Sequence, residues 1–269
     1  MTEMQTKLLE MLKWLTEYLE GNGIRYYAVG GTLLGAIRHK GFIPWDDDVD
    51  IAIPRPDYDR LINIFGNRIG KYVLETPYQN NNDFLYTFSK LYDTSTTLIE
   101  KQKKNVKRGI YIDIFPLDGL GTDYEKAIKA FKKVDQKNMF LMTRTCAIRK
   151  QRKWYKNVAI ILSRIIPFIN NKKLSLKIDS LASAILYDDS TYIANLNGAY
   201  REREIVKKEL FEMPTKYQFE TINIYGPSHY DEYLTQIYHD WKSLPPIEKR
   251  GIQHDYLLID LKKSYLDGE

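Results

Sequence analysis

Residues 30–51 read GGTLLGAIRHKGFIPWDDDVDI, and the rest of the chain is arranged around them. The stretch opens with two glycines after an apolar run. It closes with four aspartates in five residues, which lead into an apolar segment at 51–53. Carboxylates at this density repel one another, and a divalent cation is the usual group that offsets such repulsion. The stretch therefore predicts a metal-dependent phosphoryl-transfer centre.

The spacing of the aspartates indicates which of them share a face. In a strand, residues i and i+2 point to the same side, so Asp48 and Asp50 should lie together. Asp46 joins them if the strand begins early, whereas Asp47 faces the other side and is expected to be structural. Mg²⁺ takes oxygen ligands and combines few carboxylates with substrate phosphate oxygens. One ion, or two ions about 4 Å apart that clamp the attacking and leaving oxygens, would suit this arrangement.

Asp113 is the candidate for a third carboxylate. It stands in the apolar run IYIDIF at 110–115, where an unpaired charge would be costly to bury. For a short acidic motif alone, a solvated acidic loop is the more frequent explanation. Here the upstream glycines, an intervening helix and the isolated Asp113 favour a metal site. Asp48, Asp50 and Asp113 are therefore the expected catalytic and metal-binding residues.

Gly30, Gly31 and Thr32 are the first candidates for binding phosphate. They follow an apolar strand and precede a helix expected over 32–38, and backbone N–H groups at a helix N-terminus suit phosphate oxygens. Glycine also lets the backbone approach a ligand closely. The alternative is an ordinary tight turn.

Three further side chains extend this candidate phosphate site. Arg38 and His39 end the expected helix and face the same loop. Arg38 would neutralise phosphate charge there, or the two residues would simply complement the helix C-terminus. Lys90 lies in FSKLYD at 88–93. It binds phosphate if its face matches that of the aspartates, and otherwise it extends its ammonium group into solvent.

The composition is that of a globular protein, with 269 residues and a formal charge of +5. This mild charge does not imply nucleic acid as a partner. The single cysteine, Cys146, fits a reducing compartment such as the cytoplasm. No secretory signal and no apolar window of about 18 residues are visible, so no membrane-spanning helix is expected. His229, His239 and His254 lack zinc-site spacing, and His254 is not expected to reach the site.

The order of elements predicts an α+β fold, with a mixed sheet core, flanking helices and a largely helical C-terminal part. Helices are expected over 2–20, 32–38, 57–69, 123–147, 172–187 and 228–241. Strands are expected over 24–29, 49–53, 71–75, 84–92, 110–115, 192–196 and 219–225. Residues 1–121 would form the catalytic core, and residues 122–269 a mainly helical part packed on it.

A basic cluster at 144–156 precedes an apolar-rich segment at 157–169. Together they would suit a membrane interface, which would make this part the acceptor and membrane side. The alternative is a solvated basic loop beside a buried helix. The large apolar residues of the segment suit a core equally well: Ile160, Ile161, Ile165 and Phe168.

Together these residues resemble the LicD family of phosphocholine transferases. The resemblance rests on residues 30–51, on FSKLYD at 88–93 and on IDIFPLDGL at 112–120. Weaker similarity is visible at 225–238 and at 243–246. The first 120 residues are covered well, the C-terminal third loosely, and the residues between them hardly at all.

The resemblance implies a nucleotidyltransferase-like fold, similar to the polymerase-β superfamily. Carried onto this chain, the acid pair is Asp48 and Asp50, and the third acid is Asp113. It also implies CDP-choline as the donor, and a sugar hydroxyl of a teichoic acid precursor or of lipopolysaccharide as the acceptor. A lipid-linked acceptor would place the reaction in the cytoplasm, at the inner face of the plasma membrane. Relatives act on ribitol phosphate, so the fold does not fix the donor.

The quaternary ammonium of choline would need an aromatic cage. The candidates are Trp45, Tyr86, Tyr92, Tyr111, Trp154 and Tyr155. Two other functions stay open at this point. One is a conventional nucleotidyltransferase that moves a nucleoside monophosphate to a small hydroxyl compound. The other is a non-catalytic binding member of the family, which the three intact aspartates disfavour.

Overall fold

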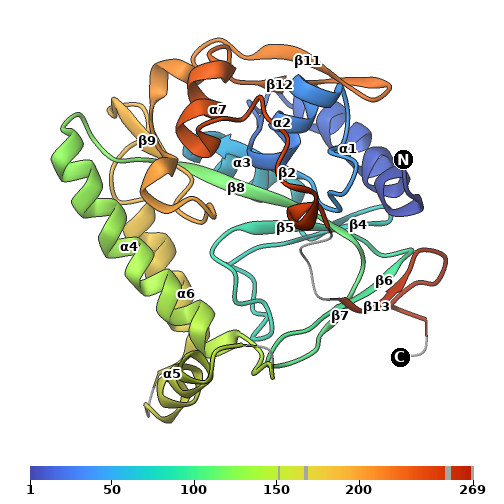
Figure 1. The fold of residues 1–269 in the computed structure, drawn as a ribbon, viewed down its shortest axis with the longest axis vertical. Helices are drawn as coiled ribbons and strands as arrows, with labels where there is room; N and C mark the ends of the chain where they lie inside the picture. The colour runs from blue at the N-terminus through green and yellow to red at the C-terminus, as the bar shows by residue number, and fades with distance from the viewer. Residues whose placement is uncertain (151, 167–168, 252–255, 268–269) are drawn as a thin grey trace.

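The computed structural model describes residues 1–269 apart from 151, 167–168, 252–255 and 268–269 (Figure 1). Its central sheet contains β1 (Tyr27–Ala28), β2 (Asp50–Pro54), β3 (Arg68–Ile69), β4 (Tyr72–Glu75), β5 (Ser89–Asp93), β8 (Tyr111–Gly119), β9 (Tyr192–Ala194) and β10 (Ile205–Lys207). The spatial order is β1-β2-β8-β5-β4-β3, while β9 pairs with β8 and with β10. Strands β2 and β8 run parallel and the other neighbours antiparallel. The predicted α+β fold with a mixed sheet is confirmed.

Two smaller sheets accompany the central one. A hairpin joins β11 (Thr215–Phe219) to β12 (Ile222–Gly226), and β13 (Tyr256–Asp260) pairs with β6 (Thr97–Glu100), which pairs with β7 (Lys107–Arg108). Of the strand predicted over 219–225, residues 222–225 are confirmed as part of β12, but the prediction missed the turn before them. The chain reverses there at Glu220, whose φ of 53° lies in the left-handed region used by tight turns.

The helices are α1 (Glu3–Gly21), α2 (Gly30–His39), α3 (Arg55–Phe65), α4 (Tyr124–Thr145), α5 (Trp154–Ile165), α6 (Asn171–Ala182) and α7 (Tyr230–Tyr238). Helix α1 begins with a capping box, in which Thr2 Oγ1 accepts from the Gln5 backbone N–H at 3.1 Å. The helix predicted over 57–69 begins earlier and stops at Phe65, because Gly66 at φ 66° ends it. Helix α7 spans Tyr230–Tyr238 and is therefore shorter than the predicted 228–241.

The two faces of the central sheet differ in chemistry. Alternate residues such as Ile51, Leu91 and Ile112 are buried and apolar, and on this side α1 and α3 pack against the sheet. The intervening residues carry charges and aromatic rings, which include Lys90 and Asp113. Because side chains alternate across a strand, all these polar groups come to the same face.

The C-terminal part packs on this sheet in two ways. Ile193, Val206 and Leu234 belong to the same buried cluster as the N-terminal half. A second cluster joins α4 and α6 to β9, with Phe131 and Ile178 among its members. The boundary at residue 121 stays a prediction. Among the described residues, no helix is both long enough and apolar enough to cross a membrane.

A buried ion network ties α3, β8 and α6 together. The Arg55 guanidinium donates from Nε and Nη2 to Asp118 at 2.6 and 3.0 Å, and from Nη1 to Asp179 at 3.1 Å. The Tyr78 hydroxyl donates to the second oxygen of Asp179 at 2.6 Å. Arg55 and both carboxylates are buried, so each charge depends on the others for compensation.

Glu204 should make folding stability fall as pH rises. It ends the short helix η1 (Arg201–Glu204), and burial raises its pKa from the ordinary 4.5 to about 7. The folded state therefore binds the proton of the Glu204 carboxyl group more tightly than the unfolded chain does. The unfolding free energy consequently falls as pH rises from 4.5 to 7. We expect Glu204→Gln to exceed wild type in unfolding free energy by roughly 3 kcal/mol at pH 8, and to match it at pH 4.

Urea unfolding across this pH range would measure the effect. The control is Glu202→Gln, because Glu202 lies on the same helix but is half exposed and should leave the pH profile unchanged. A constant difference between Glu204→Gln and wild type at all pH values would contradict the prediction.

Candidate active site

A row of charged side chains crosses the polar face of the sheet. In the strand register Asp50 of β2 lies opposite Asp113 of β8, and Asp113 lies opposite Lys90 of β5. The same row continues to Glu75 of β4. Lys90 Nζ is 2.7 Å from Asp113 Oδ1. Three of the residues predicted from the sequence are thus neighbours on adjacent strands, although Asp113 follows Asp50 by more than 60 positions.

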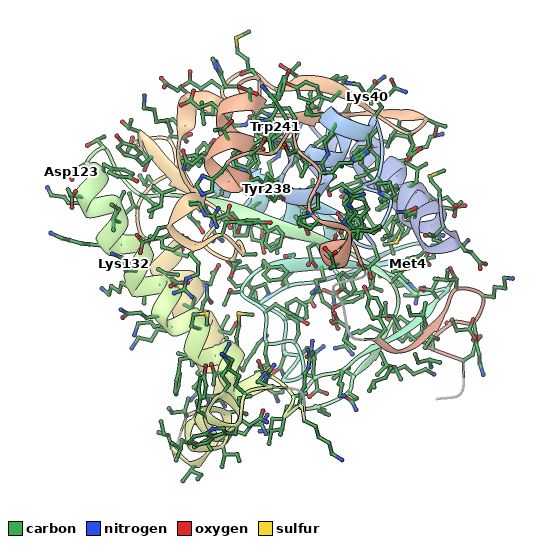
Figure 2. All side chains as sticks on the ribbon, viewed as in Figure 1. Met4, Lys40, Asp123, Lys132, Tyr238 and Trp241 are labelled. Carbon is green, nitrogen blue, oxygen red and sulfur yellow. The ribbon has the colours of Figure 1, made fainter. Side chains whose placement is uncertain are left out.

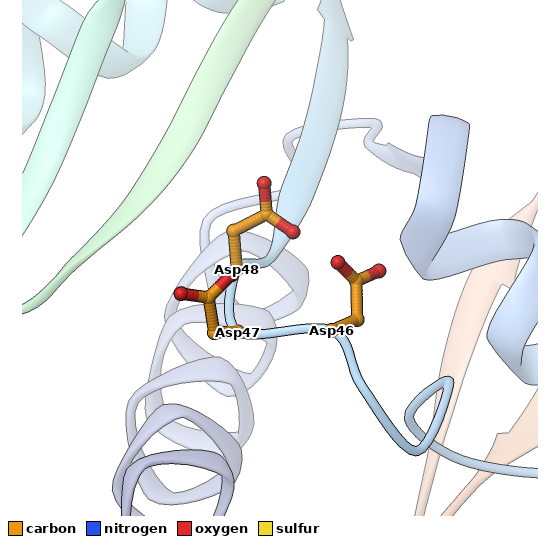
Figure 3. A group of neighbouring side chains, drawn as sticks. All are labelled: Asp46, Asp47 and Asp48. Atoms are coloured by element: carbon orange, nitrogen blue, oxygen red, sulfur yellow. The ribbon is translucent and has the colours of Figure 1, made fainter. Parts of the chain in front are cut away.

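The other three aspartates lie in the loop that leads into this row. Strand β2 begins at Asp50, so Asp46, Asp47 and Asp48 precede it and do not follow the alternation of a strand. One carboxylate oxygen of each of the three lies within 4.8 Å of the others. Asp46 and Asp48 turn toward the same space, and Asp47 points to the other side of the loop (Figure 3).

Asp47 connects this loop to the C-terminal strand. Its side chain is buried. Burial raises the pKa of the Tyr256 hydroxyl on β13, and the neighbouring Asp47 carboxylate, with which that hydroxyl shares a hydrogen bond, raises it further. The hydroxyl therefore remains a donor at neutral pH. Tyr256 received no role in the sequence analysis, because its partner lies about 200 residues away.

The site carries more negative charge than its protein cations offset. Burial raises the pKa of Asp50 well above the ordinary range, and the carboxylates of Asp48, Asp113 and Asp46 raise it further. Burial also raises the pKa of Asp113 to about 6, against the opposing effect of the Lys90 ammonium. A divalent cation bound by these oxygens would relieve the repulsion. The all-oxygen set of ligands fits Mg²⁺, and which of the carboxylates bind it stays a prediction.

Lys90 is enclosed by aromatic rings. Its Nζ lies 3.5 Å from the ring centroid of Tyr111, 4.6 Å from that of Tyr86 and 5.5 Å from that of Phe88. Burial disfavours its charged form, but the Asp113 carboxylate, the Tyr86 hydroxyl and the Glu100 carboxylate raise its pKa overall. The ammonium therefore stays charged. Its side chain lies on the same face of the sheet as Asp50 and Asp113. For this orientation the sequence analysis predicts that Lys90 binds phosphate, and that role stays a prediction.

The two glycines leave room for the acidic groups. Helix α2 begins at Gly30 itself, and the turn expected there is its first turn. A Cβ at Gly31 would lie 2.6 Å from Asp46 Oδ2, and one at Gly30 would lie 3.4 Å from Asp50 Oδ2. The Thr32 hydroxyl accepts from the Asp50 backbone N–H at 2.8 Å. The start of α2 and the start of β2 are therefore held together at the site.

Arg38 and His39 lie at the other end of α2. Arg38 Nη1 donates to the backbone carbonyls of Trp241 and Ser243 at 2.8 and 3.1 Å, and its Nε donates to His39 Nε2 at 3.0 Å. Burial and the Arg38 charge lower the pKa of His39, so the imidazole is a neutral acceptor. Arg38 thus holds the segment after α7, with His39 as its neighbour, and the proposed role of both residues toward phosphate stays a prediction.

Two tyrosines of α7 also approach the site. Tyr238, which Figure 2 labels, is the last residue of α7. Its ring packs edge to face on that of Tyr200, with ring centroids 4.8 Å apart. Burial raises the pKa values of Tyr233 and Tyr238 well above the ordinary range, and the nearby Asp50 carboxylate contributes to this. The sequence analysis assigned them no role. The weak family similarity at 225–238 was the signal that could have identified them.

Three of the six candidate cage residues lie together. Tyr86, Tyr92 and Tyr111 line one pocket with Glu100, which accepts from the Tyr111 hydroxyl at 2.6 Å and from the Tyr86 hydroxyl at 3.3 Å. The pocket volume is only 30 Å³, about the share of one water molecule, so a trimethylammonium group needs side chains to move. Trp45 instead faces the Arg250 guanidinium. Trp154 and Tyr155 lie on α5.

Comparison with known proteins identifies related sequences. The family model described as LicD/FKTN/FKRP, nucleotidyltransferase domain, matches residues 23–142. Over 95% of its length the chain is 29% identical to lipopolysaccharide cholinephosphotransferase LicD of Haemophilus influenzae, and covers 97% of that protein. It is 41% identical to human ribitol 5-phosphate transferase FKRP over 68 residues, which are 25% of this chain and 14% of that protein. Residues 23–142 thus match the LicD/FKTN/FKRP nucleotidyltransferase domain, and the chain is similar to a cholinephosphotransferase over most of its length.

Proposed function

We propose that the protein transfers phosphocholine from CDP-choline to a sugar hydroxyl of a cell-surface glycan precursor, in a reaction that depends on Mg²⁺. The observation that carries the proposal is the row formed by Asp50, Asp113 and Lys90, next to the carboxylates of residues 46–48. A surplus of carboxylates on one face of a sheet suits phosphoryl transfer, because the metal they bind would face the donor phosphates.

Each part of the row has a role in this proposal. Asp48, Asp50 and Asp113 would hold the metal, which when bound neutralises charge on the donor pyrophosphate. Lys90 keeps Asp113 ionised through their contact of 2.7 Å. Asp113 orients the acceptor hydroxyl and takes its proton. Backbone N–H groups at the start of α2, from Gly30, Gly31 and Thr32, would bind a phosphate oxygen.

The proposed transfer is a single in-line displacement. The acceptor oxygen forms a bond to the choline-bearing phosphorus, and the bond from that phosphorus to the bridging oxygen of the pyrophosphate breaks. CMP leaves with the electron pair of that bond. The hydroxyl proton passes to the Asp113 carboxylate and from there to solvent.

The nature of the acceptor is supported by the relatives alone. The Haemophilus relative is named for lipopolysaccharide, and this favours a lipopolysaccharide sugar as acceptor. A teichoic acid precursor is the other acceptor in the proposal. A lipid-linked acceptor of either kind would place the reaction at the inner face of the plasma membrane.

One assay separates phosphocholine transfer from the other functions. CDP-choline labelled either in choline or in cytidine is incubated with Mg²⁺ and candidate glycans, and the acceptor is analysed by mass and label. Phosphocholine on the glycan and free CMP are the expected products. Label from cytidine on the acceptor would show a conventional nucleotidyltransferase instead. CDP-ethanolamine is the matched donor, and equal rates with it would exclude recognition of the quaternary ammonium.

Gly31→Ala should weaken Mg²⁺ binding with little loss of stability. The new Cβ would lie 2.6 Å from Asp46 Oδ2, so the carboxylate must rotate out of the cluster. We expect the Mg²⁺ concentration for half-maximal activity to rise about tenfold, as for other disturbances of a metal-ligand shell. Gly21→Ala is the control, because nothing lies within 4 Å of a Cβ there. An unchanged Mg²⁺ dependence would remove Asp46 from the metal site.

A further inference from the structure

Helix α5 exposes a broad apolar face. Trp154 is 76% exposed, Leu162 59% and Ile165 67%. Of its residues only Ile160 and Ser163 are buried. Three further apolar side chains of the helix are also exposed: Tyr155, Val158 and Ile161. The sequence alternative of a buried core helix therefore holds for Ile160 but is wrong for Ile161 and Ile165, and Phe168 lies outside the described residues.

The surroundings of this face are uniformly basic. Residues 136–178 contain eleven Lys and Arg and no Asp or Glu. Lys150, Lys153 and Lys156 are exposed at the start of α5. Exposed apolar side chains bordered by cations are typical of helices that lie in the interface of an anionic membrane.

A hollow adjoins α5 on the side of the β6–β7 loop. It measures about 310 Å³ and combines the cations Lys101, Lys103 and Arg164 with the apolar side chains of Ile148 and Leu257. A lipid headgroup carries both features that this lining matches, an anionic phosphate and an adjoining apolar chain.

We propose that α5 docks the protein on an anionic lipid bilayer, with the apolar face in the interface and the surrounding cations on the headgroup phosphates. A second copy of this chain is the other occupant to consider. An isologous contact through α5 would bring the two basic clusters against each other, and this repulsion opposes it. The charge of the surface therefore favours lipid.

The docking surface, which consists of α5 and the adjoining hollow, also lies near the row formed by Asp50, Asp113 and Lys90. Gln102 lines both the hollow beside α5 and the pocket of Tyr86 and Tyr111, and its Nε2 donates to Glu100 at 3.2 Å. Tyr111 in turn lies over Lys90. If the proposed function holds, a lipid-linked acceptor would enter from this side. Lipid binding itself does not depend on that function.

Flotation of the whole protein with vesicles tests the proposal. We expect binding to phosphatidylcholine vesicles that contain phosphatidylglycerol, and little binding to phosphatidylcholine alone. Lys153→Glu/Lys156→Glu should lower the partition coefficient more than tenfold, because each cation near an anionic surface contributes roughly fivefold. Leu162→Glu/Ile165→Glu should abolish binding at any salt concentration, since both side chains are exposed and the fold does not need them.

The controls match these changes elsewhere on the surface. Lys126→Glu/Lys129→Glu alters the same charge near Asp123, which Figure 2 labels at the end of α4 that lies away from α5 in Figure 1. Met213→Glu introduces an acid at a residue that is 74% exposed, beside β11. Both should bind vesicles like wild type. Equal loss in the controls, or absence of wild-type binding, would overturn the proposal.

Two further readouts separate this proposal from its alternatives. Sedimentation that shows a dimer of the wild type and a monomer of Leu162→Glu/Ile165→Glu would assign the face to a second copy. Transfer to a soluble acceptor should be equal in this variant and wild type. We expect the Leu162→Glu/Ile165→Glu variant to lose vesicle binding and to keep transfer to a soluble acceptor. A wild type that binds vesicles but shows no transfer would contradict only the proposed function.

Discussion

Asp50→Asn is expected to lower kcat/KM for phosphocholine transfer by ~10³-fold, while the metal-free protein becomes more stable to heat. Asp50 is surrounded by the carboxylates of Asp46, Asp48 and Asp113, and burial with these neighbours raises its pKa. Asparagine at this position removes a negative charge that destabilises the metal-free protein. The same change removes an oxygen ligand with full negative charge, so metal and donor phosphates are held poorly.

A loss of activity together with a gain in thermal stability distinguishes a metal-binding carboxylate from a structural one. Activity with Mg²⁺ and thermal unfolding in EDTA would be measured on the same preparation. Asp189→Asn is the control, because Asp189 is an exposed carboxylate remote from the row and should change neither quantity. Activity near that of wild type would remove Asp50 from the mechanism, and a large loss of stability would show that Asp50 is instead a structural group.

Arg55→Met should destabilise the fold by about 3–5 kcal/mol, because it leaves Asp118 and Asp179 buried without their cation. For a chain of this size, that corresponds to a melting temperature lower by roughly 10 °C. Urea unfolding monitored by circular dichroism gives the free energy directly. The row of Asp50, Asp113 and Lys90 should keep its geometry in the fraction that stays folded, since Asp118 lies beyond Asp113 on β8.

Two further variants test whether unpaired buried charge causes the loss of stability. Arg60→Met removes an exposed arginine of the same helix and should cost far less. Arg55→Met combined with Asp118→Leu and Asp179→Leu replaces the whole ion network by apolar groups, and should recover much of the lost stability. If the triple variant were as unstable as Arg55→Met, lost packing rather than unpaired charge would be the cause.

The sequence was sufficient to predict the elements that carry the site. Asp113 could be singled out because one acid in an apolar strand needs a partner, and the structure gives it Lys90. Its strand pairs parallel with that of Asp50, which brings the two carboxylates together as a shared site requires. Local signals were also sufficient for α1, which was predicted over 2–20 and begins with a capping box of Thr2 and Gln5.

Other features depended on contacts between distant segments, which local patterns do not encode. Alternation placed Asp48 in the strand with Asp50, but β2 begins only at Asp50. Asp47 meets Tyr256, and Arg38 meets the carbonyl of Trp241, both across about 200 residues. The exposure of α5 was undecidable for the same reason, because an apolar helix looks alike whether a neighbour covers it or not.

The charge row also has a consequence for how the chain folds. Strands β5 and β8 are rich in apolar residues, and such strands can slide past one another by one residue during pairing. A slip of that size would set Lys90 opposite Ile112 or Ile114 and turn one set of side chains to the wrong face. The ammonium and the carboxylate would then be buried apart, at a large energetic cost. The residues proposed for catalysis thus also select the single alignment in which the sheet can close.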